Sequence, residues 1–135
     1  MAVRSLAWLG VRTHDAARMV AFYRDVLGLE VTHEAPGATW FRLANGTQVH
    51  VYGPEDTDHE FFGTAPVVGF AVDSFPAAHA AMAAAGIEVV YPEPQRAGGQ
   101  MWQHFHAPGR ECLRDHRTGM TAASLTPRLR RSCRR

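Results

Sequence analysis

The stretch that decides the fold occurs twice in this chain of 135 residues. It reads WLGVRTHDAARMVAFYRDVLGLEV at residues 8–31 and VVGFAVDSFPAAHAAMAAAGIEV at residues 67–89, with one single-residue gap between the copies. In each copy an apolar strand leads into a helix that ends at a glycine, and an apolar-Glu-Val segment then begins a new strand. Such self-similarity indicates a structural unit that is used twice.

Turn signals divide the remainder of the chain into further strands. The expected strands lie at residues 4–12, 29–34, 38–44, 47–53, 66–72, 87–91 and 99–107. Asn45-Gly46 is the strongest hairpin signal among the turns that separate them. Each half therefore reads β-α-β-β-β, with module one at residues 4–53 and module two at 66–108. We expect an α+β fold in which two βαβββ modules form a curved mixed sheet around a cleft, with the helices outside.

Composition and charge exclude several classes of protein. No apolar run approaches the roughly 18 residues of a membrane span, and the N-terminal apolar stretch is too short for a secretory signal. Two cysteines cannot form a disulfide framework or a four-cysteine zinc site. Residues 1–108 hold six Arg and eleven acids, a net −5, whereas residues 109–135 hold eight Arg and two acids, a net +6. We expect one cytoplasmic domain at residues 1–108, no membrane partner, and a separate Arg-rich tail.

The repeated segments resemble the vicinal oxygen chelate superfamily, which includes glyoxalases, bleomycin-resistance proteins and extradiol dioxygenases. The most characteristic stretch is FYRDVLGL at residues 22–29, and further matching segments are ANGTQVHVYGP (44–54), VVGFAVDSF (67–75) and AAGIEVV (84–90). The resemblance covers about residues 4–108. It implies paired βαβββ modules, a ligand cleft and, in many members, a homodimer.

The resemblance also implies a position for a divalent metal ion. In metal-dependent members His, Glu or Gln ligands come from the first and last strands of each module, which here correspond to Trp8, His50, Val67 and a position near Arg114. Imidazole and carboxylate groups suit such an ion, and His50 is the only candidate ligand among these residues. We therefore predict that no complete metal site and no cofactor are present.

Residues 109–135 do not continue the resemblance. One codon choice for GRECLRDHRTGMT (109–121), with its first base removed, reads D-G-N-V-Y-E-I-I-G-P-E and then stop. The stop does not depend on the codon choice, because Met120 followed by any Thr codon contains TGA in that frame. The shifted frame restores an ending typical of the family, with Glu where Arg114 stands. We interpret the tail as frameshifted, so that the last strand of module two is not supported by this reading.

The basic tail is also weighed as a nucleic-acid arm. The segment RLRRSCRR (128–135) lacks interleaved aromatic residues and belongs to no recognised nucleic-acid-binding fold. We therefore expect no nucleic-acid partner.

Aromatic and polar residues on the expected inner strands form the candidate ligand site. Trp8 either stacks on a flat ligand or packs the cleft floor, and Arg42 beside Trp40 is suited to a carboxylate or phenolate. His50 is either a wall residue or an acid-base or ligating group. Residues Trp102 and His104 share a strand face because they are two apart. The complete candidate set is Trp8, Trp40, Arg42, His50, Tyr52, Trp102 and His104.

The predicted function follows from this set. We expect a protein that binds a small organic ligand in the cleft and has no complete metal site, as bleomycin-resistance members do. The alternative is a glyoxalase-like lyase or ring-cleaving dioxygenase that uses Zn, Fe, Mn or Ni. The sequence leaves catalytic residues unassigned.

Overall fold

The computed structural model describes residues 1–63, 65–108 and 112–118. Within these ranges eight strands form one curled sheet in the order β2-β3-β4-β1-β5-β8-β7-β6. The elements of the first half are β1 (Val3–Arg12), α1 (Ala16–Ala21), η1 (Phe22–Val26), β2 (Glu30–Ala35), β3 (Ala38–Arg42), β4 (Gln48–Tyr52) and η2 (Glu60–Phe62). Those of the second half are β5 (Val67–Val72), α2 (Phe75–Ala84), β6 (Gln95–Ala97), β7 (Gln100–His106) and β8 (Cys112–Thr118).

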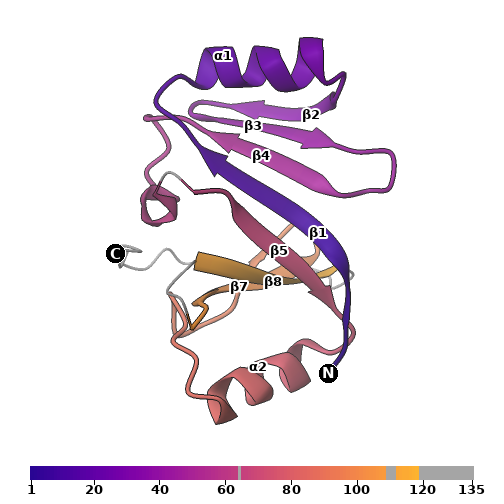
Figure 1. Ribbon diagram of the computed structural model, residues 1–135, viewed down its shortest axis with the longest axis vertical. Helices are drawn as coiled ribbons and strands as arrows, with labels where there is room; N and C mark the ends of the chain where they lie inside the picture. The colour runs from indigo at the N-terminus through magenta and orange to yellow at the C-terminus, as the bar shows by residue number, and fades with distance from the viewer. Residues whose placement is uncertain (64, 109–111, 119–135) are drawn as a thin grey trace.

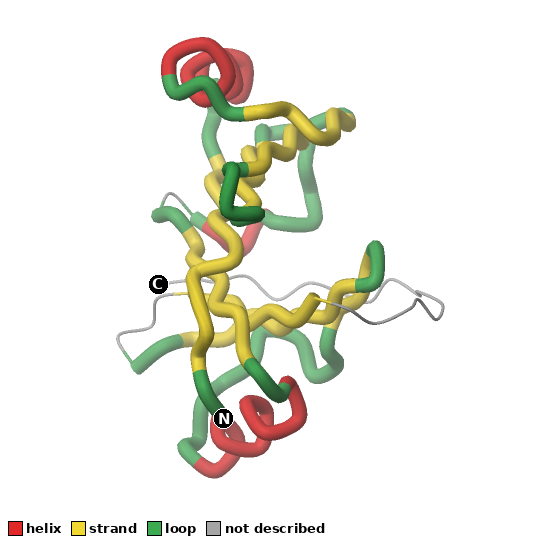
Figure 2. The backbone as a smooth tube through the Cα atoms, turned by 90° about the vertical axis from the view of Figure 1, so that its right-hand side faces the viewer, coloured by secondary structure: helices red, strands yellow, loops and turns green. Residues whose placement is uncertain are grey.

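The expected α+β fold of two βαβββ modules is confirmed. In each module the first strand pairs in parallel with the last, β1 with β4 and β5 with β8, and the modules join where β1 and β5 run antiparallel. Figure 1 shows α1 beside the first half of the sheet and α2 beside the second, and Figure 2 shows the two helices at opposite ends of the molecule. The other face of the sheet is left for the site.

The first module follows its sequence signals closely. The Asp15 carboxylate accepts a hydrogen bond from the backbone N–H of Arg18, as an N-cap does, and Gly28 ends the helical segment at φ 69°. The helix predicted through residue 27 is in fact α1 followed by the π-helical η1. Side chains on this segment pack on a buried core cluster of Phe41, Val49 and Val51.

The second module repeats this arrangement with α2. The Ser74 hydroxyl accepts from the Ala77 backbone N–H, and Ala78 is buried beneath the helix. His79 on α2 is hydrogen-bonded to the Gln103 side chain at 2.9 Å. The Gln103 amide in turn donates to the Tyr91 carbonyl at 2.8 Å, so that polar contacts also attach α2 to the outer face of β7.

The predicted strand at residues 87–91 is wrong. Only an isolated bridge joins Val89 to Phe105, and the short edge strand β6 forms further along the chain. Pro92 and Pro94 explain the difference, because proline has no backbone N–H to donate to a neighbouring strand. The hairpin predicted at Asn45-Gly46 is confirmed by a tight turn between β3 and β4.

A last strand is present although the sequence did not support one. β8 lies between β5 and β7, parallel to the former and antiparallel to the latter. Sheet pairing uses backbone groups, which explains why a segment of unusual composition takes this place. The register sets Arg114 opposite Gly69 on one side and His104 on the other. In the described ranges no helix is long and apolar enough to cross a membrane.

Candidate functional site

A row of aromatic rings crosses the face of the sheet opposite the helices. Trp40 and His50 are direct cross-strand neighbours, and their rings stack with centroids 4.6 Å apart and planes 8° apart. His33 packs on the other face of Trp40 at 4.5 Å. Trp8 on β1 meets His50 edge-on at 5.5 Å. This row, which extends from β2 to β1, is the aromatic row of the site.

Trp8 lies at the centre of the site and is only 1% exposed. Two glycines make room for its indole. A Cβ atom on Gly69 would lie 2.9 Å from the Trp8 Cβ, and one on Gly10 would overlap the indole and lie 2.7 Å from Phe62. The position of Trp8 therefore depends on the absence of side chains at both neighbours.

Arg114 is buried beside Trp8, with 3% of its surface exposed. Its guanidinium carbon lies 4.3 Å from the ring centroids of both Trp8 and Trp102, which places the cation between two indole faces. Indole is the best aromatic partner for a cation, and such contacts strengthen when they are desolvated. The guanidinium is a fixed positive charge inside the site.

The four positions that correspond to metal ligands come together here but do not fit a divalent cation. Val67 belongs to the same buried cluster as Trp8. The Trp8 ring in turn contacts the His50 ring and the Arg114 guanidinium. Indole, isopropyl and guanidinium groups offer no lone pair to a metal, and the guanidinium repels one. Across the described residues no group of three or more His, Cys, Asp or Glu side chains is placed to hold an ion.

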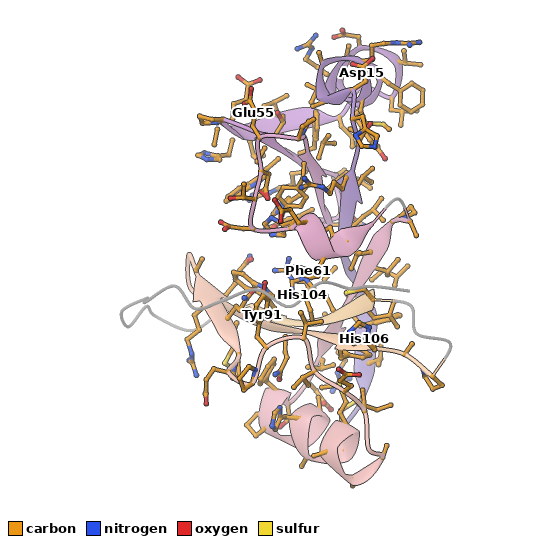
Figure 3. The ribbon with its side chains drawn as sticks, turned by 90° about the vertical axis from the view of Figure 1, so that its left-hand side faces the viewer. Asp15, Glu55, Phe61, Tyr91, His104 and His106 are labelled. Carbon is orange, nitrogen blue, oxygen red and sulfur yellow. The ribbon has the colours of Figure 1, made fainter. Side chains whose placement is uncertain are left out.

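His104 is the most deeply buried imidazole of the site, at 1% exposure. Burial, followed by the positive charges of Arg114 and His59, lowers the pKa of His104 well below its ordinary value, so the ring is neutral at pH 7. Both of its ring nitrogens are buried without a hydrogen-bond partner in the described part of the chain, and the same holds for Trp8 Nε1. Figure 3 shows Phe61 beside His104.

Tyr52 and His50 form a buried polar pair. Their hydroxyl oxygen and Nδ1 are hydrogen-bonded at 2.9 Å. Burial raises the pKa of Tyr52, while the charge of Arg114 works in the opposite direction, and burial prevails. The phenol therefore remains protonated under ordinary conditions.

The sequence interpretation missed a histidine–carboxylate pair beside this site. His59 Nδ1 donates to the Asp56 carboxylate at 2.9 Å, and the imidazole stacks on Tyr52 with centroids 3.8 Å apart. Burial, the largest influence, acts to raise the pKa of Asp56, but hydrogen bonds and charge from His59 outweigh it and lower the pKa. Arg12 donates to the Asp56 carbonyl at 2.7 Å, which fixes the loop on β1.

The sequence interpretation also missed the cover of the site. Phe61 and Phe62 of η2 are buried, the first at 5.1 Å from the His104 ring and the second at 5.8 Å from the Trp8 ring. Phe61 also packs edge-on against Tyr91 at 5.6 Å, and the three labelled side chains lie together in Figure 3. The only signal in the sequence was a Phe-Phe pair within an otherwise polar loop.

The structure brings together most of the predicted ligand residues. Trp8, His50, Tyr52 and His104 are buried in one group, and Trp102 joins it through Arg114. Trp40 lies at the edge of the group, 38% exposed. Arg42 is exposed on β3 opposite Glu30 and Gln48, and in the described ranges it makes no hydrogen bond or ion pair.

Two βαβββ modules in one curled sheet are the architecture expected of the vicinal oxygen chelate class of proteins. Residues 5–117 match the family model described as the Glyoxalase/Bleomycin resistance protein/Dioxygenase superfamily. The chain belongs to that superfamily. No curated protein matches it.

Solved structures of similar fold include two methylmalonyl-CoA epimerases. A variant of the Streptomyces coelicolor enzyme, in complex with 2-nitronate-propionyl-CoA, is 19% identical with a TM-score of 0.65, and the match covers 89% of this chain and 100% of that chain. The Mycobacterium tuberculosis enzyme is 18% identical with a TM-score of 0.67, and the match covers 87% of this chain and 89% of that chain. A superfamily member from Vibrio splendidus 12B01 has 20% identity, a TM-score of 0.60 and coverages of 85% and 98%. At these identities the likeness concerns the fold.

Proposed function

We propose that this protein binds a small organic molecule at the inner face of the sheet and does so without a complete metal site. The observation that carries the proposal is the composition of the site centre. Superfamily members often use a divalent metal, but here Trp8, Val67 and Arg114 stand with His50 at the positions that would hold it. Packed side chains replace ligand atoms at these positions.

The aromatic row supports a flat or partly aromatic ligand. Trp40 is held parallel to His50 and remains partly exposed, so that part of its indole is accessible to a planar group. The Streptomyces coelicolor relative is described in complex with a CoA ester, which shows that this fold accommodates small organic ligands. The metal-dependent lyase or dioxygenase is not favoured, because its chemistry requires ligand atoms that three of the four positions lack.

The proposal extends to partners and location. Exposed apolar side chains at the end of η1, Val26 at 71% and the following Leu27 at 50%, support the expected homodimer. Neither a nucleic acid nor a membrane is proposed as a partner. The Arg-rich segment 119–135 lies outside the described residues, and the cytoplasmic location remains a prediction.

A thermal-shift screen tests the proposed function. Purified protein is heated with a panel of aromatic metabolites and, separately, with divalent metal salts. We expect at least one organic compound to raise the melting temperature and the metals to have no effect. Trp40→Ala should weaken binding of the active compound about tenfold, as loss of a stacking partner does. Leu6→Ala, which removes an exposed apolar side chain from β1, is the control. A panel without any active compound, or equal binding by both variants, contradicts the proposal.

A further inference from the structure

We propose that the centre of this site receives a carboxylate of the ligand, held by the Trp8 indole N–H, His104 and the Arg114 guanidinium. The inference rests on the proposed function for the existence of a ligand and adds the chemical group that the ligand must carry. A ligand carboxylate would then contact the Arg114 guanidinium at the positions that the family resemblance assigns to metal ligands.

The first observation is a missing hydrogen-bond acceptor. Trp8 Nε1 and both ring nitrogens of His104 are fully buried and have no hydrogen-bond partner in the described residues. An indole N–H only donates, and a neutral imidazole has one donor nitrogen. Leaving such groups buried and unpaired destabilises the folded protein. An acceptor atom near both rings would remove this cost.

The second observation is a contrast between the two tryptophans that enclose Arg114. The Trp102 indole N–H donates to the Gln95 side-chain carbonyl at 3.0 Å, so its hydrogen-bonding capacity is used within the protein. The Trp8 N–H, on the other side of the same guanidinium, has no such acceptor in the described chain. The Trp8 ring packs edge-on against His104 and Phe62, so the unused donor belongs to this buried group of rings.

The third observation is the sign of the local charge. The Arg114 guanidinium lies across the strand pair from His104, and its charge acts on that imidazole. A buried positive charge favours an anionic guest over a neutral or cationic one, and a guanidinium suits the geometry of a carboxylate.

Two rings of η2 pack on this centre. Phe61 and Phe62 lie against His104 and Trp8, so we expect a ligand that reaches the donors to displace these side chains. Two of the three proposed groups, Trp8 and His104, precede residue 109. Their contribution is therefore independent of the reading frame of the last strand, and only the contribution of Arg114 depends on it.

The indole N–H resonances of the full chain provide the test, with benzoate as the anionic probe and benzamide as its neutral counterpart. Benzoate should shift the Trp8 indole proton downfield and leave that of Trp102 in place, and benzamide should bind at least about tenfold more weakly. Trp8→Phe, which keeps a ring but removes the N–H, and Arg114→Gln should each weaken benzoate about tenfold. Arg96→Gln, an exposed arginine on β6, should not change it.

The outcomes separate this inference from the proposed function. Equal binding of benzoate and benzamide overturns the carboxylate assignment and leaves ligand binding intact. A loss of benzoate binding in Arg42→Gln but not in Arg114→Gln moves the anion to the exposed arginine of β3 and also overturns it. If compounds from the thermal-shift screen bind but benzoate does not, the assignment fails, and if nothing binds, the proposed function fails. The wild-type spectra need no variant, so misfolding of Trp8→Phe leaves the test valid.

Discussion

Trp8 determines what the site can do. Its indole stands at a position that the family resemblance assigns to a metal ligand, and it makes the cation–π contact with the buried Arg114. The indole fits only because Gly10 and Gly69 lack side chains. Trp8 and the two glycines around it therefore pack as one unit. The effects of substitutions within this unit on the free energy of unfolding should not be additive.

Gly10→Ala tests this unit. The added methyl group would overlap the Trp8 indole and lie close to Phe62, so we expect a loss of about 1–3 kcal/mol in the free energy of unfolding. Denaturant unfolding at pH 7 measures it. In a Trp8→Ala background the same change should cost clearly less, because the overlapping indole is gone and only the close contact with Phe62 remains. An equal cost in both backgrounds would mean that the methyl group is resisted by something other than Trp8.

Asp56→Asn tests the histidine–carboxylate pair beside the site. The pKa of Asp56 is lowered in the folded state, so its contribution to stability is present above the ordinary carboxyl pKa of about 4 and is lost as the pH falls through the folded value. We expect the variant to melt below the wild type at pH 7 and the two curves to converge towards pH 3. Glu93→Gln, an exposed acid, serves as control. Parallel melting curves over this range would contradict the assignment.

The sequence predicts the site residues that lie on regular strands, but it does not predict those on the loop after β4. His50 and Tyr52 share a strand face by spacing alone, and the superfamily resemblance placed Trp8 beside them. The role of His59 escapes the sequence, because its contacts with Asp56 and Tyr52 depend on how residues 54–62 fold over the sheet. No local pattern carries that information.

At the scale of elements, β8 is the strand on which the account depends most. It lies between β5 and β7 and pairs with both, so it completes the sheet of the second module. It also carries the buried Arg114. Its sequence, CLRDHRT, is a poor match for a central strand, because Asp is depleted in strands and a buried Arg is costly to desolvate. The shifted reading frame, VYEIIGP over the same residues, is far richer in strand-forming residues.

Restoring the shifted frame tests the frameshift hypothesis. A chain whose residues from 109 onward are D-G-N-V-Y-E-I-I-G-P-E should unfold at a free energy about 3 kcal/mol higher, which corresponds to a melting temperature roughly 10 °C higher. Thermal unfolding of the two chains under identical conditions gives the comparison. A control chain that merely ends after residue 118 separates the effect of the strand from that of the tail. A small difference between restored and given chains would count against the hypothesis.

The internal repeat predicted the elements well because both helices carry caps and end at glycines. The sequence-based strand assignment failed where the strand propensity of a segment disagrees with the pairing that its neighbours allow. IEVVY at residues 87–91 has the composition of a strand, yet Pro92 and Pro94 follow it and only a single bridge forms. The composition of β8 is unfavourable for a strand, yet β8 pairs with the edges of β5 and β7.

At the scale of the whole molecule, the exposed apolar surface formed by η1 and the following Leu27 predicts self-association. Phe22, Val26 and Leu27 are all more than 40% exposed although they follow a helix whose other face is packed on the sheet. We expect light scattering to report a homodimer and Val26→Asp to convert it to a monomer, because a charge there opposes apolar burial. Arg18→Asp, on the exposed part of α1, should leave the dimer intact. A wild-type monomer at high concentration would refute this prediction.

The central claim is that a packed, positively charged centre replaces the metal of this superfamily. Elemental analysis of the purified protein after incubation with Zn, Fe, Mn and Ni salts tests it most directly, with His50→Ala as the comparison. We expect well under one equivalent of any divalent ion per chain and no difference between the two proteins. One equivalent of a divalent ion in the wild type that is lost in His50→Ala would contradict it.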